Sequence, residues 1–199
     1  MPSPSDRAPS SPERMPSPPG RAPSPDRAED GPRARGCEER GFFTLEEVLG
    51  LPGCPGIDDL RGRRLAVVEC GHAIPCDPCQ WACPTGAITI GDDITALPVL
   101  DPARCDGCGT CQPVCPGLAI FLVDMRRDDG RAEVWLPHEF LPVPQKGETV
   151  LVRDRAGTVV GEGEVRRVRR GARLDRTTIV HVLVPEELAM VARAIEAPR

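Results

Sequence analysis

Short blocks of apolar and β-branched residues predict most of the regular structure of this chain as β-strands. Residues 65–69, 149–153 and 177–184 are blocks of this kind, and the last is β-branched along most of its length. Branched side chains pack well on a pleated sheet. Residues 158–165 alternate in polarity and contain glycines suited to a bend or bulge. Ala156-Gly157 marks a hairpin turn before them.

Two other segments carry the signals of helix starts. Within residues 41–51, Thr44 is an N-cap candidate, and Glu47 three residues later completes a capping box. Near the carboxy terminus, Pro185 and the two glutamates after it predict the first turn of a helix. The buried stripe of this terminal helix would consist of Leu188, Val191, Ala192 and Ile195. Together with the strands, it predicts a small β-barrel closed by a helix.

Residues 1–40 differ from the rest in composition. Proline and serine recur there in Pro-Ser-Pro, Ala-Pro-Ser and Pro-Asp-Arg motifs with balanced charge. Such a segment cannot bury enough apolar area to offset the entropy of ordering, so we expect a disordered extension. A wrongly assigned start codon would explain it equally well, and Met15 is one internal candidate.

The chain lacks the sequence signals of a membrane or secreted protein. No stretch of its 199 residues approaches the ~20 apolar residues that span a membrane. Its amino terminus has no apolar core of the kind that a secretory signal needs. We therefore expect a soluble protein with no membrane span, in the reducing conditions of the cytoplasm.

Cysteine spacing carries the chemical information. Four cysteines and a proline form a C-x2-C-x2-C-x3-C-P run, namely Cys105, Cys108, Cys111, Cys115 and Pro116. Bacterial-type ferredoxins hold [4Fe-4S] clusters with this spacing, and the fourth cysteine ligates the other cluster of the pair. A related run lies 32 positions upstream and contains Cys76, Cys79, Cys83 and Pro84. The chain therefore contains an internal repeat, which resembles the two halves of a two-cluster ferredoxin.

One ligand departs from the repeat. The position equivalent to Cys105 is Ala73, and the nearest upstream cysteine is Cys70. We expect the longer loop, residues 71–75, to bring Cys70 back to the first cluster, because cysteine is the usual iron–sulfur ligand. Two alternatives stay open: His72 supplies the ligand, or the first cluster has three irons or is absent.

The expected ligation crosses between the two runs. The first cluster would be held by Cys70, Cys76, Cys79 and Cys115. The second cluster would be held by Cys105, Cys108, Cys111 and Cys83. Crossing of this kind places the two [4Fe-4S] clusters near each other.

Zinc and disulfide bonds are the alternatives for these cysteines. Two C-x2-C pairs can form a four-cysteine zinc site. Zinc, however, explains neither four cysteines in one run nor the duplication with its Cys-Pro endings. Disulfides would indicate a small secreted domain. Cys37 and Cys54 lie outside the runs, and we interpret them as ordinary thiols.

Charge is unevenly distributed along the chain. Between Arg64 and Arg126, only Arg104 opposes a series of acids: Glu69, Asp77, Asp92, Asp93, Asp101, Asp106 and Asp124. These acids form either a solvated surface or a docking surface for a basic redox partner. A later basic stretch contains Arg166, Arg167, Arg169, Arg170, Arg173 and Arg176. It has no interleaved aromatic residues for base stacking, so nucleic acid is not an expected partner.

Several segments resemble one family of ferredoxin-like proteins. They are Cys70 with Cys76-Asp-Pro-Cys79, Cys83-Pro-Thr-Gly-Ala-Ile88, Leu97-Pro-Val-Leu100, Leu136-Pro-His-Glu-Phe-Leu-Pro142 and Val184-Pro-Glu-Glu-Leu-Ala-Met190. Over about residues 42–195 the chain is similar to 4Fe-4S ferredoxin-like proteins found with FAD-dependent amino-acid or amine dehydrogenases, of the dye-linked proline or hydroxyproline type. The resemblance implies an iron–sulfur subunit that accepts electrons from a partner flavoprotein.

The expected fold class is α+β. A short helix and linker would occupy residues 41–61, a two-cluster ferredoxin-like domain 62–126, and a small β-barrel-like module with a terminal helix 127–199. No nucleophile–base pair, phosphate loop or Rossmann fingerprint is present, so we expect an electron-transfer protein and not an enzyme. A free-standing ferredoxin and a non-redox interaction protein with a metal-stapled scaffold are the alternatives.

Overall fold

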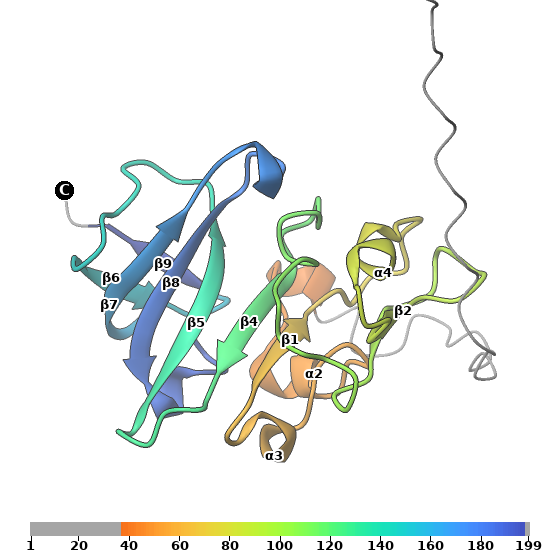
Figure 1. Cartoon of the computed structure of the whole chain (residues 1–199), viewed down its shortest axis with the longest axis horizontal. Helices are drawn as coiled ribbons and strands as arrows, with labels where there is room; N and C mark the ends of the chain where they lie inside the picture. Colours follow the sequence, from red (N-terminus) through yellow and green to blue (C-terminus); the bar gives the residue numbers. More distant parts are fainter. Residues whose placement is uncertain (1–36, 198–199) are drawn as a thin grey trace, which may run out of the picture.

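The computed structural model describes residues 37–197, and its main feature is one antiparallel sheet of seven strands (Figure 1). The bounds are β1 (Arg64–Val68), β4 (Ile120–Asp124), β5 (Arg131–His138), β6 (Thr149–Arg153), β7 (Val159–Arg169), β8 (Thr178–Pro185) and β9 (Ala194–Glu196). Neighbouring strands follow the order β1-β4-β5-β8-β7-β6-β9. Because β1 and β9 lie at opposite edges, the sheet is open.

A smaller part of the fold lies beyond β1. There β2 (Ile88–Thr89) pairs with β3 (Val99–Leu100). The short helices of the chain are α2 (Leu45–Leu49), α3 (Ile57–Leu60) and α4 (Pro78–Ala82). Two 3-10 turns, η1 (Ala172–Leu174) and η2 (Glu186–Leu188), lie in the connections between strands of the large sheet. Figure 1 places α4 and β2 at the opposite end of the molecule from β6, β7 and β9. Residues 37–40 are helical, and the rest of the predicted extension, 1–36, lies outside the described residues.

The predicted start of the first helix is confirmed. The Glu47 N–H donates to Thr44 Oγ1 at 3.3 Å, and the Thr44 N–H donates to Glu47 Oε2 at 2.7 Å. Both hydrogen bonds of the capping box are thus formed. The apolar blocks that predicted strands also form strands, namely β1, β6, β7 and β8.

The predicted terminal helix is wrong. Only the single turn η2 follows β8, and β9 then pairs with β6, with Ile195 opposite Val152. One helical turn fixes several backbone dihedrals for few hydrogen bonds. Pairing with β6, in contrast, satisfies the backbone groups of an otherwise open sheet edge. Arg193 is buried, whereas a helix with the predicted stripe would leave it outside the buried face.

The strands after residue 126 do not close into a barrel. They belong to the same open sheet as β1 and β4, because β5 pairs with β4 on one side and with β8 on the other. The apolar pattern did not predict β5. The expected boundary at residue 126 falls in the connection between β4 and β5, and the division into two modules stays a prediction.

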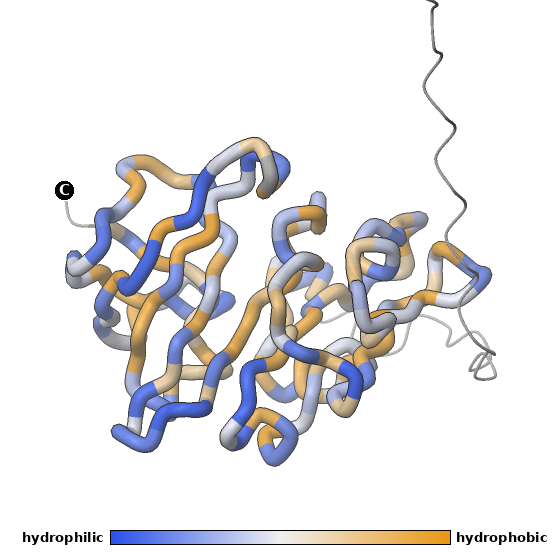
Figure 2. Tube along the Cα trace, in the orientation of Figure 1, coloured by the Kyte–Doolittle hydropathy of each residue, from blue (hydrophilic) through white to orange (hydrophobic). Residues whose placement is uncertain are grey.

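Strand β1 separates two hydrophobic cores. Leu65 and Val67 face the larger core, whereas Ala66 and Val68 face a smaller one, as the two-residue period of a strand requires. In Figure 2, hydrophobic residues run along the central strands, and hydrophilic residues gather at many of the connections. The smaller core, which we call the cysteine core, also contains Ala87, Ile88, Ile90, Leu100, Cys79, Cys111 and Ile120.

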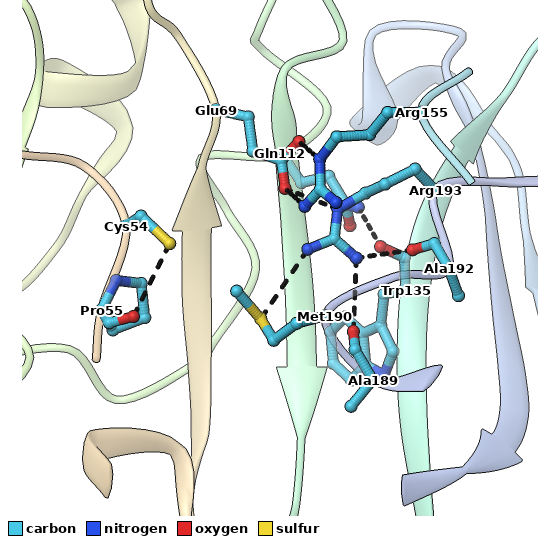
Figure 3. Close-up of polar contacts among 10 residues, drawn as sticks. All are labelled: Cys54, Pro55, Glu69, Gln112, Trp135, Arg155, Ala189, Met190, Ala192 and Arg193. Atoms are coloured by element: carbon cyan, nitrogen blue, oxygen red, sulfur yellow. Dashed lines mark hydrogen bonds and ion pairs between the residues drawn. The ribbon is translucent and has the colours of Figure 1, made fainter. Parts of the chain in front are cut away.

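A buried ionic network joins the end of β1 to the last strands of the sheet (Figure 3). The Glu69 carboxylate accepts hydrogen bonds from Arg155 Nε at 2.7 Å and from Arg193 Nε at 2.5 Å. Burial raises the pKa of Glu69, but the charges and hydrogen bonds of the two arginines outweigh it and hold the pKa below its usual range. Glu69, which the sequence placed among the acids of a surface, is therefore internal and paired.

A second polar group lies within the sheet. Glu133 on β5 accepts a hydrogen bond from Trp135 Nε1 at 2.7 Å and is bonded to His181 Nδ1 at 2.9 Å. The indole and imidazole rings stack with their centroids 4.0 Å apart. The hydrogen bond to His181 lowers the pKa of Glu133, and the bond from Trp135 adds to this against the opposing effect of burial.

We expect Glu133→Gln to reduce stability by about 1–2 kcal/mol near neutral pH, because hydrogen bonds to an ionised group are lost. A carboxyl with a lowered folded pKa stabilises the fold above its unfolded pKa of about 4.3, and this contribution is lost as the pH falls through the folded pKa. The difference in urea-unfolding free energy between parent and variant should therefore shrink as the pH is lowered below about 4.3.

The matched control is Glu164→Gln, which removes an exposed ion pair with Arg166. It should change the unfolding free energy little at any pH. A Glu133→Gln difference that stays constant from neutral to acidic pH would contradict this account of the Glu133 carboxylate.

Candidate metal centre

The eight predicted ligands lie in segments that pack around the cysteine core and β1. Cys70 follows β1 by two residues, Cys79 lies within α4, and Cys115 lies in the loop that leads to β4. The others are Cys76 and Cys83 on either side of α4, and Cys105, Cys108 and Cys111 in the loop before β4. Segments far apart in the sequence are thus brought to one region of the molecule.

Four of the thiols face one cavity. It is lined by Cys70, Cys76, Cys79 and Cys115, with apolar walls that include Val68, Ile90 and Ile120. Burial raises the pKa of the Cys79 thiol to about 11, and the neighbouring thiols of Cys115, Cys76 and Cys70 also raise it. Burial and the charge of Cys115 likewise raise the pKa of Cys70 and of Cys76. Free thiolates are disfavoured here, and a bound cationic group would stabilise them.

The other four thiols form a second group. Burial raises the pKa of Cys111 strongly, and the nearby Cys105, Cys83 and Cys108 raise it further. Cys83 belongs to the first run by sequence but lies with the second run in space, and Cys115 does the reverse. The structure thus brings together the two sets that crossed ligation requires, while the ligation itself stays a prediction.

Backbone N–H groups donate to sulfur at equivalent positions of the two repeats. The Ala87 N–H donates to Cys83 Sγ at 3.2 Å, and the Ala119 N–H donates to Cys115 Sγ at 3.4 Å. The Thr85 hydroxyl adds a contact of 3.5 Å to Cys83. Burial raises the pKa of Cys83, but these hydrogen bonds outweigh it and lower the net value. Hydrogen bonds to sulfur are one of the means by which proteins set the potential of iron–sulfur clusters.

The first group of thiols fits an iron–sulfur cube. Among residues 37–197, no three His, Cys, Asp or Glu side chains converge closely enough to hold a single metal ion. A four-iron cube binds each thiolate at a different iron, so its ligands surround a space and do not meet at one point. Four thiols around an apolar cavity have this arrangement.

Cys70, which the sequence analysis predicted as the displaced ligand, lies in the first group, whereas Ala73 is exposed on the loop that follows it. His72 lines the same cavity, and its Nε2 lies 3.9 Å from the sulfur of Cys37. Cys54 packs against the larger core, where burial raises the pKa of its thiol to about 11. Of these side chains, Cys70 and His72 reach the cavity, and Cys54 does not.

Two glutamines anchor the ligand loops, a role that the sequence analysis did not assign. Gln80 and Gln112 are equivalent in the repeat. Gln80 Oε1 accepts the Ile90 N–H at 2.5 Å, which ties α4 to the end of β2. Gln112 Nε2 donates to the Trp135 carbonyl at 2.7 Å, which ties the second loop to β5. Their equivalent positions in the cysteine repeat were the sequence signal from which this anchoring role could have been predicted.

Comparison with known proteins agrees with this geometry. A family model for a 4Fe-4S dicluster domain matches residues 69–129. An uncharacterized ferredoxin-like protein of Haemophilus influenzae is 36% identical over 77 residues, which cover 36% of this chain and 86% of the relative. The chain belongs to the ferredoxin-like proteins. Residues 69–129 thus correspond to an iron–sulfur domain of the 4Fe-4S dicluster type.

Two further relatives are much longer than the region they share with this ferredoxin-like chain. The isethionate sulfite-lyase activating enzyme of Desulfovibrio desulfuricans is 31% identical over 104 residues, 52% of this chain and 28% of the enzyme. One component of the Na(+)-translocating ferredoxin:NAD(+) oxidoreductase complex of Acetobacterium woodii is 44% identical over 45 residues, 23% of this chain and 13% of that component.

No solved structure matches the ferredoxin-like chain. Within residues 37–197, none of the helices combines the length and the apolar character that crossing a membrane would require.

Gly107 offers a selective test of the second ligand group. It lies between Cys105 and Cys108 at a φ of +67°, and a Cβ there would overlap the carbonyl oxygen of Arg64 on β1. Gly107→Ala should therefore displace this loop and lower the iron content from about eight to about four per chain, measured after anaerobic purification.

The matched control is Gly130→Ala. Gly130 has a similar φ of +71°, but a Cβ there would meet no atom within 4 Å. This variant carries the same backbone strain without the collision, and its iron content should equal that of the parent. Equal iron content in both variants would contradict the proposed close packing of the second ligand loop on β1.

Proposed function

We propose that this chain carries electrons through two [4Fe-4S] clusters. One would be held by Cys70, Cys76, Cys79 and Cys115, and the other by Cys83, Cys105, Cys108 and Cys111. The observation that carries the proposal is the division of the eight thiols into two groups, each with one member from the other run. Such exchange of the fourth ligand is a property of two-cluster ferredoxins. The match to a dicluster family model supports it.

The residues of this chain would supply position, hydrogen bonds and a dry environment. Bound clusters of this kind accept and release single electrons. The N–H groups of Ala87 and Ala119 point at ligand sulfurs and favour the more negative, reduced state. The apolar walls of Val68 and Ile120 act in the opposite direction, because burial disfavours added charge. The balance of these two effects sets the reduction potential.

The electron donor, in this proposal, is an FAD-dependent amino-acid or amine dehydrogenase. A reduced flavin holds two electrons and passes them singly to one-electron carriers. Two adjacent clusters could take up these two electrons one at a time. The sequence resemblance to ferredoxin-like partners of such dehydrogenases supports the assignment. A relative that is named as part of an oxidoreductase complex supports only the general idea of a partner subunit. A free-standing ferredoxin that serves several enzymes is the second candidate, favoured by a ferredoxin-like relative that the shared region covers to 86%.

The partner would dock beside the first cavity. Three large apolar side chains are exposed around Cys76: Ile74 lines the cavity, the carbonyl of Ile94 accepts the Cys76 N–H, and Trp81 donates to Asp77. Trp81 is 63% exposed. Residues 65–103 contain no lysine or arginine, so the charge around this patch is acidic. An apolar centre with an acidic rim fits a partner whose docking surface is apolar and basic.

A reductive titration tests the proposed function. The anaerobically purified chain should take up about two electrons, one for each cluster, with loss of the visible absorbance of the oxidised clusters. The Cys70→Ser and Cys105→Ser variants should each affect one of the two reductions. Uptake of no electrons by an iron-containing parent would rule out the electron-transfer role.

Small oxidants of opposite charge test the docking surface. At low ionic strength, the reduced chain should be oxidised by hexaamminecobalt(III), a trication, with a rate constant that falls steeply as salt is added. The triple variant Asp77→Asn, Asp92→Asn, Asp93→Asn should react several-fold more slowly. Ferricyanide, an anion, should show the opposite trend. Glu164→Gln, on β7 at the far end of the sheet, is the control and should leave both rates unchanged. Equal rates for the triple variant and the parent would contradict docking at this surface.

A further inference from the structure

Cys70 cannot be held in the way that the other ligands are held. In the second run, Cys105 is only three positions before Cys108, in a tight turn with Gly107 at positive φ. Cys70 is instead separated from Cys76 by a loop, residues 71–75, most of which is exposed. This loop contacts the rest of the chain through His72, which lies against the Phe43 ring and the Cys37 sulfur. The charged contacts that fix the backbone next to Cys70 lie on its other side, at the end of β1.

The end of β1 is fixed through Glu69. Its N–H donates to the Ala119 carbonyl at 2.8 Å, which extends the pairing of β1 with β4 by one residue. Side chains alternate along this extended segment: Val68 lines the cavity, Glu69 points to the opposite face, and Cys70 returns to the cavity. Any rotation of the backbone that moves the Glu69 side chain would also move Cys70.

Two arginines from the C-terminal strands hold Glu69 from that opposite face (Figure 3). Arg155, in the turn between β6 and β7, binds the carboxylate with Nε at 2.7 Å and Nη2 at 2.5 Å. Arg193, just before β9, donates from Nε to Oε1 at 2.5 Å. The side chains of Glu69, Arg155 and Arg193 are 8%, 10% and 4% exposed, respectively. Paired planar hydrogen bonds of this kind fix direction as well as distance.

Arg193 is itself fixed by its surroundings. Its Nη1 donates to the carbonyls of Ala189 and Ala192, at 3.2 Å and 2.5 Å, and its guanidinium lies 4.8 Å from the centre of the Phe121 ring on β4. Its Nη2 contacts the sulfur of Met190. The network therefore connects the turn after η2, the β6–β7 turn and β4 to a single carboxylate.

We propose that Arg155 and Arg193 are positioning residues for Cys70, the displaced ligand of the first cluster. Through Glu69 they hold the end of β1 in the direction that points the Cys70 thiol into the first cavity. The strands after residue 126 thereby complete the first cluster site, while the second site has all its ligands in its own loop and at Cys83. This inference rests on the proposed two-cluster function.

Arg155→Gln is the variant that tests the inference. Iron and acid-labile sulfide are counted per chain after anaerobic purification, and low-temperature EPR spectra of the reduced protein separate the two clusters. Cys70→Ser and Cys105→Ser assign each signal to its cluster. Arg155→Gln should lose or alter the signal that Cys70→Ser alters, with iron falling from about eight toward about four, and should keep the signal that Cys105→Ser alters. Arg155→Lys, which keeps the charge, should restore part of the first signal.

Arg153→Gln is the matched control. Arg153 lies two residues away on β6, and its side chain binds the carboxylate of Glu196. The substitution leaves in place its backbone carbonyl, which accepts the Arg193 N–H at 2.9 Å. It should leave both signals unchanged. Glu69→Gln is a second variant, since it keeps the side-chain size and removes the charge that both arginines bind. It should reproduce the selective effect of Arg155→Gln.

The outcomes separate the two claims. Unchanged iron and unchanged signals in both Arg155→Gln and Glu69→Gln would overturn the positioning role and leave the two-cluster function intact. Loss of both signals in equal proportion in these variants would also overturn it, since it would mean that the network only stabilises the fold. A parent protein without iron and sulfide would contradict the proposed function itself.

Discussion

The pairing of β1 with β4 is the constraint on which the candidate site depends. Val68 lies opposite Ile120 at the end of the ladder, so the chain segments just beyond these residues must lie side by side. One of those segments carries Cys70 and the other carries Cys115. The thiol that we propose as the displaced ligand is thereby brought to the thiol that we propose to cross over from the other run. Without this pairing, residues 45 positions apart in the sequence would have no reason to share a cavity.

The sequence repeat explains why the two groups of thiols have similar surroundings. The segments that follow each half of the repeat differ, and they explain why the surroundings are not identical. Backbone N–H groups reach Cys83 and Cys115 at equivalent positions. The two anchoring glutamines, in contrast, have different partners, because the first half is followed by the small β2–β3 sheet and the second by the large one. In our proposal, the fourth ligand of the first site, Cys70, is held from outside its own run. The exposed Trp81 lies beside that site, where it donates to Asp77.

Much of the candidate site could be predicted from the sequence, because cysteine spacing and the repeat are local properties of the chain. The capping box at Thr44 and Glu47 was predictable for the same reason. Strand β5 was not, because it contains Pro137 and begins with Arg131 and Glu133, which weaken the apolar pattern. It is a strand because both of its neighbours pair with it.

The errors at the carboxy terminus have a similar cause. The sequence from Pro185 onward has local helix signals, but pairing with β6 and burial of Arg193 decide its structure. Glu69 was placed among surface acids because it begins a stretch, from residue 65 to 103, that contains acids but no lysine or arginine. Its partners are 86 and 124 positions away, a distance that no local pattern can cover.

The central claim is that eight thiols, crossed between two runs, hold two four-iron clusters. The most direct test is to purify the chain without oxygen and to count iron and acid-labile sulfide per polypeptide. The account predicts about eight of each. About four of each would contradict the first site and its displaced ligand, and zinc without sulfide would contradict the iron–sulfur assignment as a whole.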